Sequence, residues 1–521
     1  MDRKKDRPAV HIRRVPLVNA NYDTYKPNGF VEQNTFLTMP QEYAEVPTFE
    51  NSKCLLPEPI WKGHESAIDC YWKTWQLAFK NIHKLDPESG FVANYIDTAF
   101  NDCIFMWDTC FILMFARYGS RAFSFLRTLD NFYSKQHKDG FICREIGKHL
   151  GDDRFQRFDP TSTGPELMPW TEWEYYLNLG DKDRLARVFP VLVAFHQWMR
   201  DYRTWPDGAY WASGWASGMD NQPRMGHNLP GYVETFYHDH MVWLDACLQG
   251  VLSASILVQM AGELGRENDV PDMLQEIDNL TRVINTKLWD KQTSFYYDLH
   301  KDGTLSDCKS IAAYWALLAG VVPPRCLKPF LAHLENSKEF MRAHRVPALS
   351  ADDPQYDPNG GYWKGSVWPP TNYMVLRGLT RVGQDNLAYE IGRNHHNAIV
   401  KTFEDTGTVF ENYAPDYIAE GNVAARDFVG WGGLPPIAVF LEYVIGLQAN
   451  IPNNRIMWNV NLLEEHGVKN YPFGAMGTLD LLCEARMSAT QEPDIIAKSS
   501  VPLELEICWS DGHQTIKVEP T

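Results

Sequence analysis

The sequence predicts a mainly α-helical protein in which two layers of helices form one large barrel, with an extended arm before it and a small β element after it. Three observations predict this fold. Apolar residues recur at helical spacing over most of residues 61–450. Helices that are apolar on every face alternate there with amphipathic ones, as a double ring of buried inner and half-buried outer helices requires. The longest connections between them are rich in aromatic residues, glycine and proline, which indicates one site built from loops at one end of the barrel.

The chain divides into three segments by composition. Residues 1–60 are rich in proline, asparagine and short polar stretches, and we expect an extended arm that lies over the rest. Residues 61–450 hold the helical barrel. Its clearest apolar stripes run through Phe125, Leu129 and Phe132, through Val188, Leu192, Phe195 and Met199, and through Leu274, Ile277, Leu280, Ile284 and Leu288. Residues 451–521 alternate polar and apolar with period two, which predicts a small antiparallel β element.

Aromatic residues are unusually frequent. Trp 18, Tyr 24 and Phe 26 make up 13% of the chain, and a sequence so rich in aromatic side chains is not disordered. The formal net charge of −17 repels a polyphosphate, so we expect no nucleic-acid partner. The aromatic side chains either fill a large core or form stacking platforms for sugar rings, and composition leaves both open.

The sequence indicates a cytoplasmic protein without a membrane partner. The N-terminal segment MDRKKDRPAVHIRRVPLV is basic, but no apolar region of a signal peptide follows it. The longest apolar run, residues 250–262, is too short to span a bilayer and contains Gln259, so it predicts a buried helix. Ten cysteines without a CxxC pair favour reduced thiols. A signal peptide trimmed from the chain would instead place the protein in the periplasm or outside the cell.

Several common chemistries have no motif here. The dinucleotide, P-loop and HExxH patterns are absent, and we expect no cofactor. The best metal candidates are His238-Asp239-His240 and the pair His395-His396. Neither has a third ligand at recognisable spacing, and surface or capping histidines are commoner, so we expect no metal.

Two carboxylates among tryptophans indicate glycosidic bond cleavage. This reaction needs one carboxylic acid to protonate the leaving oxygen, and one carboxylate to activate water or to attack the sugar. Asp220 lies in a loop marked by glycine and proline, between Trp215 and Arg224. Glu411 lies in a second such loop, followed by Trp431. A single Asp or Glu is more often a helix cap or an exposed charge. The two acids together therefore indicate a catalytic site more strongly than either acid alone.

Four ordered segments carry a resemblance to a known family. Trp107-Asp108-Thr109-Cys110-Phe111 is similar to WDTFF, residues 217–224 (SGMDNQPR) to SGMDNSPR, residues 361–373 (GYWKGSVWPPTNY) to GYWRGPVWPPINY, and residues 411–413 to ENY; residues 428–431 (FVGW) are similar to FTGW more weakly. Over about residues 90–445 the chain resembles the (α/α)6-barrel glycoside hydrolases of family 63. These include bacterial mannosylglycerate and glucosylglycerate hydrolases, and the trehalases are more distant relatives.

The resemblance implies an (α/α)6 barrel and an inverting, exo-acting glycosidase that removes an α-linked sugar from a small glycoside or oligosaccharide. Asp220 would be the general acid and Glu411 the general base, roughly 6.5–9.5 Å apart. Asp220 must stay protonated, and the apolar Trp215 and Met219 beside it would raise its pKa by desolvation. The implied substrate-binding residues are Trp107, Asp108, Trp215, Arg224, Trp363, Lys364, Trp368, Asn372, Tyr413 and Trp431. Arg144 and Glu145 are further candidates that pair with each other in the simpler interpretation.

Departures from the family segments keep the substrate and other functions open. Lys364 replaces an Arg, Ser366 a Pro and Ala216 a Glu, and Thr163-Gly164-Pro165 stands where Gln-Pro-Pro or Asn-Pro-Pro is usual. Specificity for glycerate glycosides is therefore not carried over. Helical double barrels also house phosphorylases, which need a phosphate pocket, and epimerases or lyases, in which His238 and His240 would matter more. A non-catalytic carbohydrate-binding protein is the third alternative.

Overall fold

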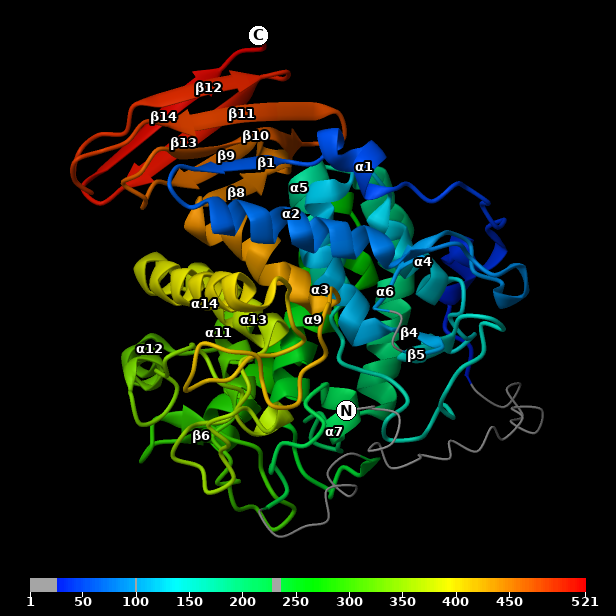
Figure 1. The fold of residues 1–521 in the computed structure, drawn as a ribbon. Coiled ribbons are helices and arrows are strands. Elements are labelled where there is room, and N and C mark those ends of the chain that lie inside the picture. The colour runs from blue at the N-terminus through cyan, green and yellow to red at the C-terminus, as the bar shows by residue number, and fades with distance from the viewer. Residues whose placement is uncertain (1–25, 99–100, 227–235) are drawn as a thin grey trace.

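The computed structural model describes residues 26–98, 101–226 and 236–521 of the chain, and it is helix-rich with β-sheets at the C-terminal end (Figure 1). Its helices are α1 (Phe49–Ser52), α2 (Glu65–Lys80), α3 (Met106–Ala116), α4 (Thr128–Tyr133), α5 (Met168–Leu179), α6 (Lys182–Tyr202), α7 (Gly214–Ser217), α9 (Leu244–Leu264), α10 (Met273–Val283), α11 (Trp315–Ala319), α12 (Pro324–Leu331), α13 (Pro369–Arg381), α14 (Asp385–Thr406) and the π-helix η15 (Leu434–Val444). The helix-rich class predicted from the apolar periodicity is confirmed.

Among the described helices, six follow one another around a closed ring. α3 contacts α5, and the ring continues through α9, α11, α13 and η15 back to α3. α6 and α10 contact α9 from outside this ring, and α14 contacts α13 and η15. Every residue of α3 is buried, whereas α10 buries only Met273, Leu280 and Val283. This difference follows the apolar and amphipathic patterns of the sequence, and the complete double ring stays a prediction.

The C-terminal segment forms two four-stranded sheets that lie together on one side of the helices (Figure 1). Their strands are β8 (Leu447–Asn450), β9 (Arg455–Asn459), β10 (His466–Phe473), β11 (Gly477–Cys483), β12 (Ile495–Ser499), β13 (Leu503–Trp509) and β14 (Gly512–Val518), with β1 (Glu58–Trp61) from the N-terminal side. The predicted antiparallel pairing is wrong at one place, because β9 and β13 are parallel. Period two identifies strands but does not encode the direction of their partners.

The N-terminal side of the chain contributes one strand to these sheets. β1 pairs with β10 in antiparallel fashion, so that Ile60 lies opposite Gly467. Between residues 26 and 57 the chain forms short turns, namely the 3-10 helices η3 (Val31–Gln33), η4 (Thr35–Thr38) and η5 (Lys53–Leu55), besides α1. The first 25 residues of the predicted arm lie outside the described residues.

The long apolar run predicted as a buried helix lies in α9. In the described part of the chain, α9 alone is long and apolar enough to cross a membrane by length and composition. Its most apolar window is 78% buried inside the protein, as in the core helix of a globular domain.

A buried network of charges joins four helices of the ring. Arg117, directly after α3, binds Glu174 of α5 at 3.1 Å and Glu442 of η15 at 2.6 Å. Arg377 of α13 binds Glu174 at 2.7 Å and lies 3.5 Å from Glu442. The hydroxyl of Tyr373 donates to Glu442 at 2.9 Å. Burial alone would raise the pKa of Glu174, but the two guanidinium groups outweigh it and hold this pKa below its usual value. Two cations therefore balance two anions, which is the condition for burying charge.

A second buried network surrounds His196 of α6. Its Nδ1 lies 2.9 Å from the carboxylate of Glu166 and its Nε2 3.1 Å from that of Glu276 in α10. Ser253 of α9 donates to Glu166 at 2.7 Å, and Tyr210 donates to Glu276 at 2.7 Å. Burial alone would lower the pKa of His196, but the two carboxylates raise it to about 10, and the network lowers the pKa of Glu276 to about 2 although burial opposes this.

Replacing Glu442 by Gln should lower the free energy of unfolding by about 3–5 kcal/mol, because it leaves the buried Arg117 and Arg377 partly uncompensated. Glu404→Gln is the matched control, since Glu404 forms an exposed pair with Lys401. Chemical denaturation of both variants measures the difference. Equal stability of the two variants would mean that the network does not hold the ring together.

His196→Gln should destabilise the protein most between about pH 4.5 and 6.5. The pKa of His196 is raised from 6.5, so its stabilising effect is complete below 6.5 and is lost as the pH rises towards 10. The pKa of Glu276 is lowered from 4.5, so its effect is complete above 4.5 and is lost as the pH falls towards 2. Denaturation of wild type and variant across this range measures it. A stability difference that does not change with pH would contradict the charged state of His196.

Candidate active site

Asp220 follows a short helix whose two ends are fixed by the local sequence. The hydroxyl of Ser213 accepts a hydrogen bond from the backbone N–H of Ala216 and caps the start of α7. Gly218 ends the helix in the left-handed region, with φ +79°, where glycine is favoured. Asp220 comes two residues later and is partly exposed, so its carboxyl group can meet a ligand. α7 lies on the side of the helices away from the C-terminal sheets (Figure 1).

The two residues after Asp220 attach this loop to other segments. Asn221 donates to the backbone oxygen of Gly361 at 3.2 Å and accepts from the backbone N–H of Trp363 at 2.9 Å. Gln222 donates to the backbone oxygen of Ala348 at 2.7 Å and is buried. Sequence reasoning missed both residues, although they stand inside the SGMDNQPR segment. Asn221 therefore fixes the Asp220 loop against residues 361–363, and Gln222 fixes it against Ala348.

Arg224 also holds this loop, through bonds to two carboxylates, and its predicted contact with substrate stays a prediction. Its guanidinium donates to both carboxylate oxygens of Asp245 and to both of Asp298, at 2.6–2.8 Å. The side chain is 1% exposed and lies over the ring of Trp243. These donors are already used, so Arg224 anchors the chain after Asp220 to the start of α9.

Glu411 lies in a second loop that is joined to the same segment. Its carboxylate accepts a hydrogen bond from the backbone N–H of Ala425 at 3.1 Å, and the side chain is buried. The indole of Trp431 donates to the backbone oxygen of Glu411 at 2.8 Å. Two residues later, Tyr413 exchanges both backbone hydrogen bonds with Val367, at 2.8 and 3.0 Å. The loops of Asp220 and Glu411 therefore both attach to residues 361–367.

The start of α3 closes the site on a third side. A Cβ atom on Gly218 would lie 2.8 Å from the indole of Trp107, so the ring of Trp107 packs directly on the loop before Asp220. The indole Nε1 of Trp107 and Oδ1 of the neighbouring Asp108 are both buried, and neither has a hydrogen-bond partner among the residues that the structure describes. Buried polar atoms are rarely left so, because each costs free energy. A donor and an acceptor are thus available here to a polar ligand such as a sugar hydroxyl.

The pKa of Asp108 is raised well above its usual value. Burial is the largest cause, and the negative charges of Asp97 and Glu145 add to it, while Arg144 acts against them. Arg144 pairs with Glu145 at 2.5 Å, as the simpler interpretation expected, and also donates to the backbone oxygen of Trp215 at 3.0 Å. Residues 144–145 thereby connect the surroundings of Asp108 to α7.

Four of the five tryptophans predicted to stack on sugar are buried in the wall of the site. Trp363 and Trp368 stack on each other, with ring centroids 4.0 Å apart, and the edge of Trp431 meets Trp368 at 5.7 Å. Trp107 is also buried, against Gly218. Trp215 is partly exposed and lies under the guanidinium of Arg144. The ring pair of Trp363 and Trp368 therefore shapes the site, and Trp215 has the most accessible face.

Three more of the predicted binding residues use polar groups for hydrogen bonds within the protein. The side chain of Asn372 is fully buried, donates to the backbone oxygens of Val346 and Trp368, and accepts from the N–H of Val346. The hydroxyl of Tyr413 accepts from the backbone N–H of Phe410 at 3.0 Å. Lys364 is partly exposed and donates to Gln355 at 2.5 Å. Their hydrogen bonds hold the segments that carry Trp368 and Glu411.

The two histidine motifs contact different neighbours. Nδ1 of His238 accepts from the backbone N–H of His240, and the two rings pack near Trp205. His395 lies in the core, where its Nδ1 is 2.7 Å from Nε2 of His344. Burial lowers the pKa of His344 to about 3, so this pair is neutral.

Comparisons with known proteins agree on one class of enzyme. The model of the mannosylglycerate hydrolase MGH1-like glycoside hydrolase domain matches residues 104–420. A probable mannosyl-oligosaccharide glucosidase of Schizosaccharomyces pombe is 23% identical over 405 residues, which are 63% of this chain and 48% of that protein. The mannosylglycerate hydrolase of Rubrobacter radiotolerans is 24% identical over 416 residues, covering 64% of this chain and 90% of that protein.

The fold is similar to that of a solved glycoside hydrolase structure. The GH63 mannosylglycerate hydrolase of Thermus thermophilus, in complex with glucose, superposes with a TM-score of 0.56 at 19% identity. The match covers 71% of this chain and 99% of that one. At this identity it is the arrangement of helices that is shared.

Gly218→Ala should destabilise the protein more than Gly208→Ala. Both glycines have a left-handed φ, +79° and +86°, so each substitution strains the backbone by about 1–2 kcal/mol. A Cβ at Gly208 meets no atom within 4 Å, whereas one at Gly218 collides with Trp107, which adds about 1–3 kcal/mol. Denaturation measures the stability difference and tryptophan fluorescence reports the displaced ring. Equal losses would show that Trp107 does not pack on this loop.

Proposed function

The chain belongs to the mannosylglycerate hydrolase MGH1-like glycoside hydrolase family, and on this premise we propose that it is an inverting, exo-acting glycosidase with Asp220 as general acid and Glu411 as general base. It is a glycosidase by its family. The proposal adds the stereochemistry, the roles of the two carboxyl groups, the (α/α)6 form of the barrel and an α-linked sugar as the group removed.

One observation carries the assignment of the two acids. The Asp220 loop is hydrogen-bonded to Gly361 and Trp363, and the Glu411 loop is hydrogen-bonded to Val367. Two acids that stand 191 positions apart in the sequence (411 minus 220) therefore lie in loops that attach to one short segment. This shared attachment supports the proposal that the two carboxyl groups flank one glycosidic bond.

In the proposed mechanism, the protonated carboxyl of Asp220 gives its proton to the glycosidic oxygen while the bond to the anomeric carbon breaks. The carboxylate of Glu411 takes a proton from a water molecule, and the oxygen of this water bonds to the anomeric carbon on the opposite face. The released sugar then has the inverted configuration. Both carboxyl groups return to their starting states once Asp220 regains a proton from solvent and Glu411 loses its own.

Trp107 and Asp108 would bind the sugar in this scheme. Their unpartnered indole N–H and carboxylate oxygen can pair with sugar hydroxyls, which removes the cost of leaving them buried and unsatisfied. Trp215 would offer a ring face to the sugar because it is partly exposed. The other tryptophans would act through the shape of the wall.

Substrate specificity should depend on the positions at which the chain departs from the family segments. Ala216 and residues 163–165 line one small cavity of about 20 Å³ behind α7, together with Gln249 of α9. We propose a glucosyl or mannosyl glycoside as substrate class, after the matched glucosidase and mannosylglycerate hydrolase. Glycerate is not carried over as the leaving group, because the chain departs from the family segments at these positions. The ten cysteines are all free thiols, which supports action in the cytoplasm.

Asp220→Asn and Glu411→Gln should each lower kcat about 10²–10⁴-fold on the best natural glycoside, since each removes one proton transfer. The two variants should differ on a glycosyl fluoride, whose leaving group needs no proton. Asp220→Asn should keep most activity on it and Glu411→Gln should not. Glu420→Gln, an exposed residue of the same loop as Glu411, is the control and should be fully active. Full activity of either site variant on both substrates would refute its assignment.

A further inference from the structure

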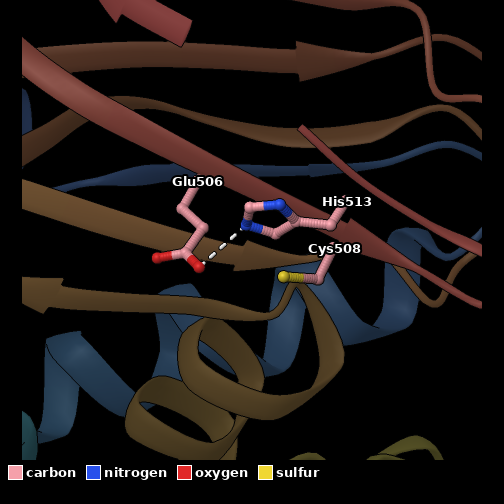
Figure 2. Close-up of side chains that lie close together, drawn as sticks. All are labelled: Glu506, Cys508 and His513. Carbon is pink, nitrogen blue, oxygen red and sulfur yellow. Dashed lines mark hydrogen bonds and ion pairs between the residues drawn. The ribbon is translucent and has the colours of Figure 1, made fainter. Parts of the chain in front are cut away.

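Three side chains of the types that bind metal ions meet on the C-terminal β13–β14 hairpin, on the sheet side of the molecule. They are Glu506 and Cys508 of β13 and His513 of β14 (Figure 2). One ligand atom from each, a carboxylate oxygen, Sγ and a ring nitrogen, lies within 4.8 Å of the others. Of the described residues, no other trio of histidine, cysteine and acidic side chains meets in this way.

The strand register holds the three side chains on one face. Cys508 lies directly opposite His513 in the antiparallel pair, and Glu506 is two residues before Cys508. Since side chains of alternate residues point to the same face of a strand, all three side chains lie on one side of the sheet, as Figure 2 shows. β13 is also paired with β9 on its other edge, so the strand is fixed from both sides. The backbone that carries two of the three ligands is therefore rigid.

The existing contacts leave ligand atoms that a cation could bind. Glu506 Oε1 lies 2.9 Å from Nε2 of His513, while Oε2 is paired with Arg455 at 3.1 Å. A metal ion between Glu506 and His513 would replace the first contact and leave the pair with Arg455 in place. Cys508 Sγ has no hydrogen bond among those described, and the side chain is partly exposed. Its pKa is raised by burial first and then by the negative charges of Glu506 and Asp385, so a cation here would enter a negative field.

We propose that Glu506, Cys508 and His513 form a zinc site in the C-terminal sheet, separate from the glycosidase site. A carboxylate, a thiolate and an imidazole are the three ligand types that Zn²⁺ takes in proteins, at about 2.0–2.3 Å. The ligand atoms already lie within 4.8 Å of one another, so the proposed ion would draw them together to these distances. The fourth position faces solvent and takes water. On binding, Cys508 loses its proton to solvent and the imidazole binds in its neutral form, so no oxidation or reduction is involved.

The site was not predicted from the sequence, although its signal is short and local. The segment ELEICWSDGH places Glu506, Cys508 and His513 at spacings of two and five residues. Such spacing brings side chains together only on a hairpin whose turn lies between Cys508 and His513. The turn between Trp509 and Gly512 supplies this geometry.

Titration of the full-length protein with Zn²⁺ against a zinc indicator tests the site. We expect one ion per chain, and Cys508→Ser and His513→Ala should each weaken binding at least about 10-fold, the loss that even an outer partner of a metal site produces. Cys54→Ser removes the exposed thiol outside the site and should bind zinc as wild type does. The Co²⁺ form should show thiolate-to-cobalt charge-transfer absorption, and Cys508→Ser should lack it.

A measurement on the wild-type protein keeps the test independent of how the variants fold. Zinc should slow alkylation of Cys508 at least about 10-fold, as located by mass spectrometry, and leave alkylation of Cys54 unchanged. No stoichiometric binding, or binding that survives in both ligand variants, would overturn the proposal. In that case the cluster is only the chain of ion pairs from Arg455 through Glu506 to His513.

Discussion

The buried quartet of Arg117, Glu174, Arg377 and Glu442 is the interaction on which the arrangement of the site depends. It fastens α3, α5, α13 and η15 to one another far along each helix. The starts of these helices carry the site: Trp107 and Asp108 open α3, Trp368 precedes α13, and Trp431 precedes η15. A buried network of two cations and two anions holds these helices together, and the loss of one member leaves a buried charge uncompensated. The relative positions of the loops between these helices therefore depend on the charge network.

Hydrogen bonds between loops further fix the positions of the residues of the candidate site. Asn221 joins the Asp220 loop to residues 361–363, and the backbone pair of Val367 and Tyr413 joins that segment to the Glu411 loop. Arg224 fixes the far end of the Asp220 loop to the start of α9 through Asp245. A glycosidase needs two carboxyl groups at a constant separation, and rigid support of this kind is how a protein keeps flexible loops in catalytic geometry. The aromatic wall of Trp363, Trp368 and Trp431 fills the space between the supports.

Much of this could be predicted from local patterns, and the rest depends on contacts between distant residues. The stripe from Val188 to Met199 lies in α6, and the alternating segment 503–509 is β13, because helical and strand periods are written in neighbouring residues. Neighbouring residues do not encode the parallel pairing of β9 with β13 or the pairing of β1 with β10. Each of these contacts joins segments that are far apart in the chain. For the same reason the motif residue Arg224 was expected at the substrate, whereas Asp245 and Asp298, which bind it, stand in segments with no visible motif. Five tryptophans were expected to stack on sugar, and three of them, Trp363, Trp368 and Trp431, pack against one another.

Asp220 and Glu411 are proposed to act at one glycosidic bond, with Asp220 protonating the leaving oxygen and Glu411 activating a water molecule on the opposite face. Proton NMR during the first minutes of hydrolysis tests this pair of roles, because the released anomer is seen before mutarotation mixes the two forms. An α-linked substrate should release the β-anomer first, with the α-anomer growing in later. Initial release of the α-anomer would mean a covalent intermediate on one of the carboxylates and a shorter separation between them, about 5–5.5 Å, which would contradict the roles assigned here.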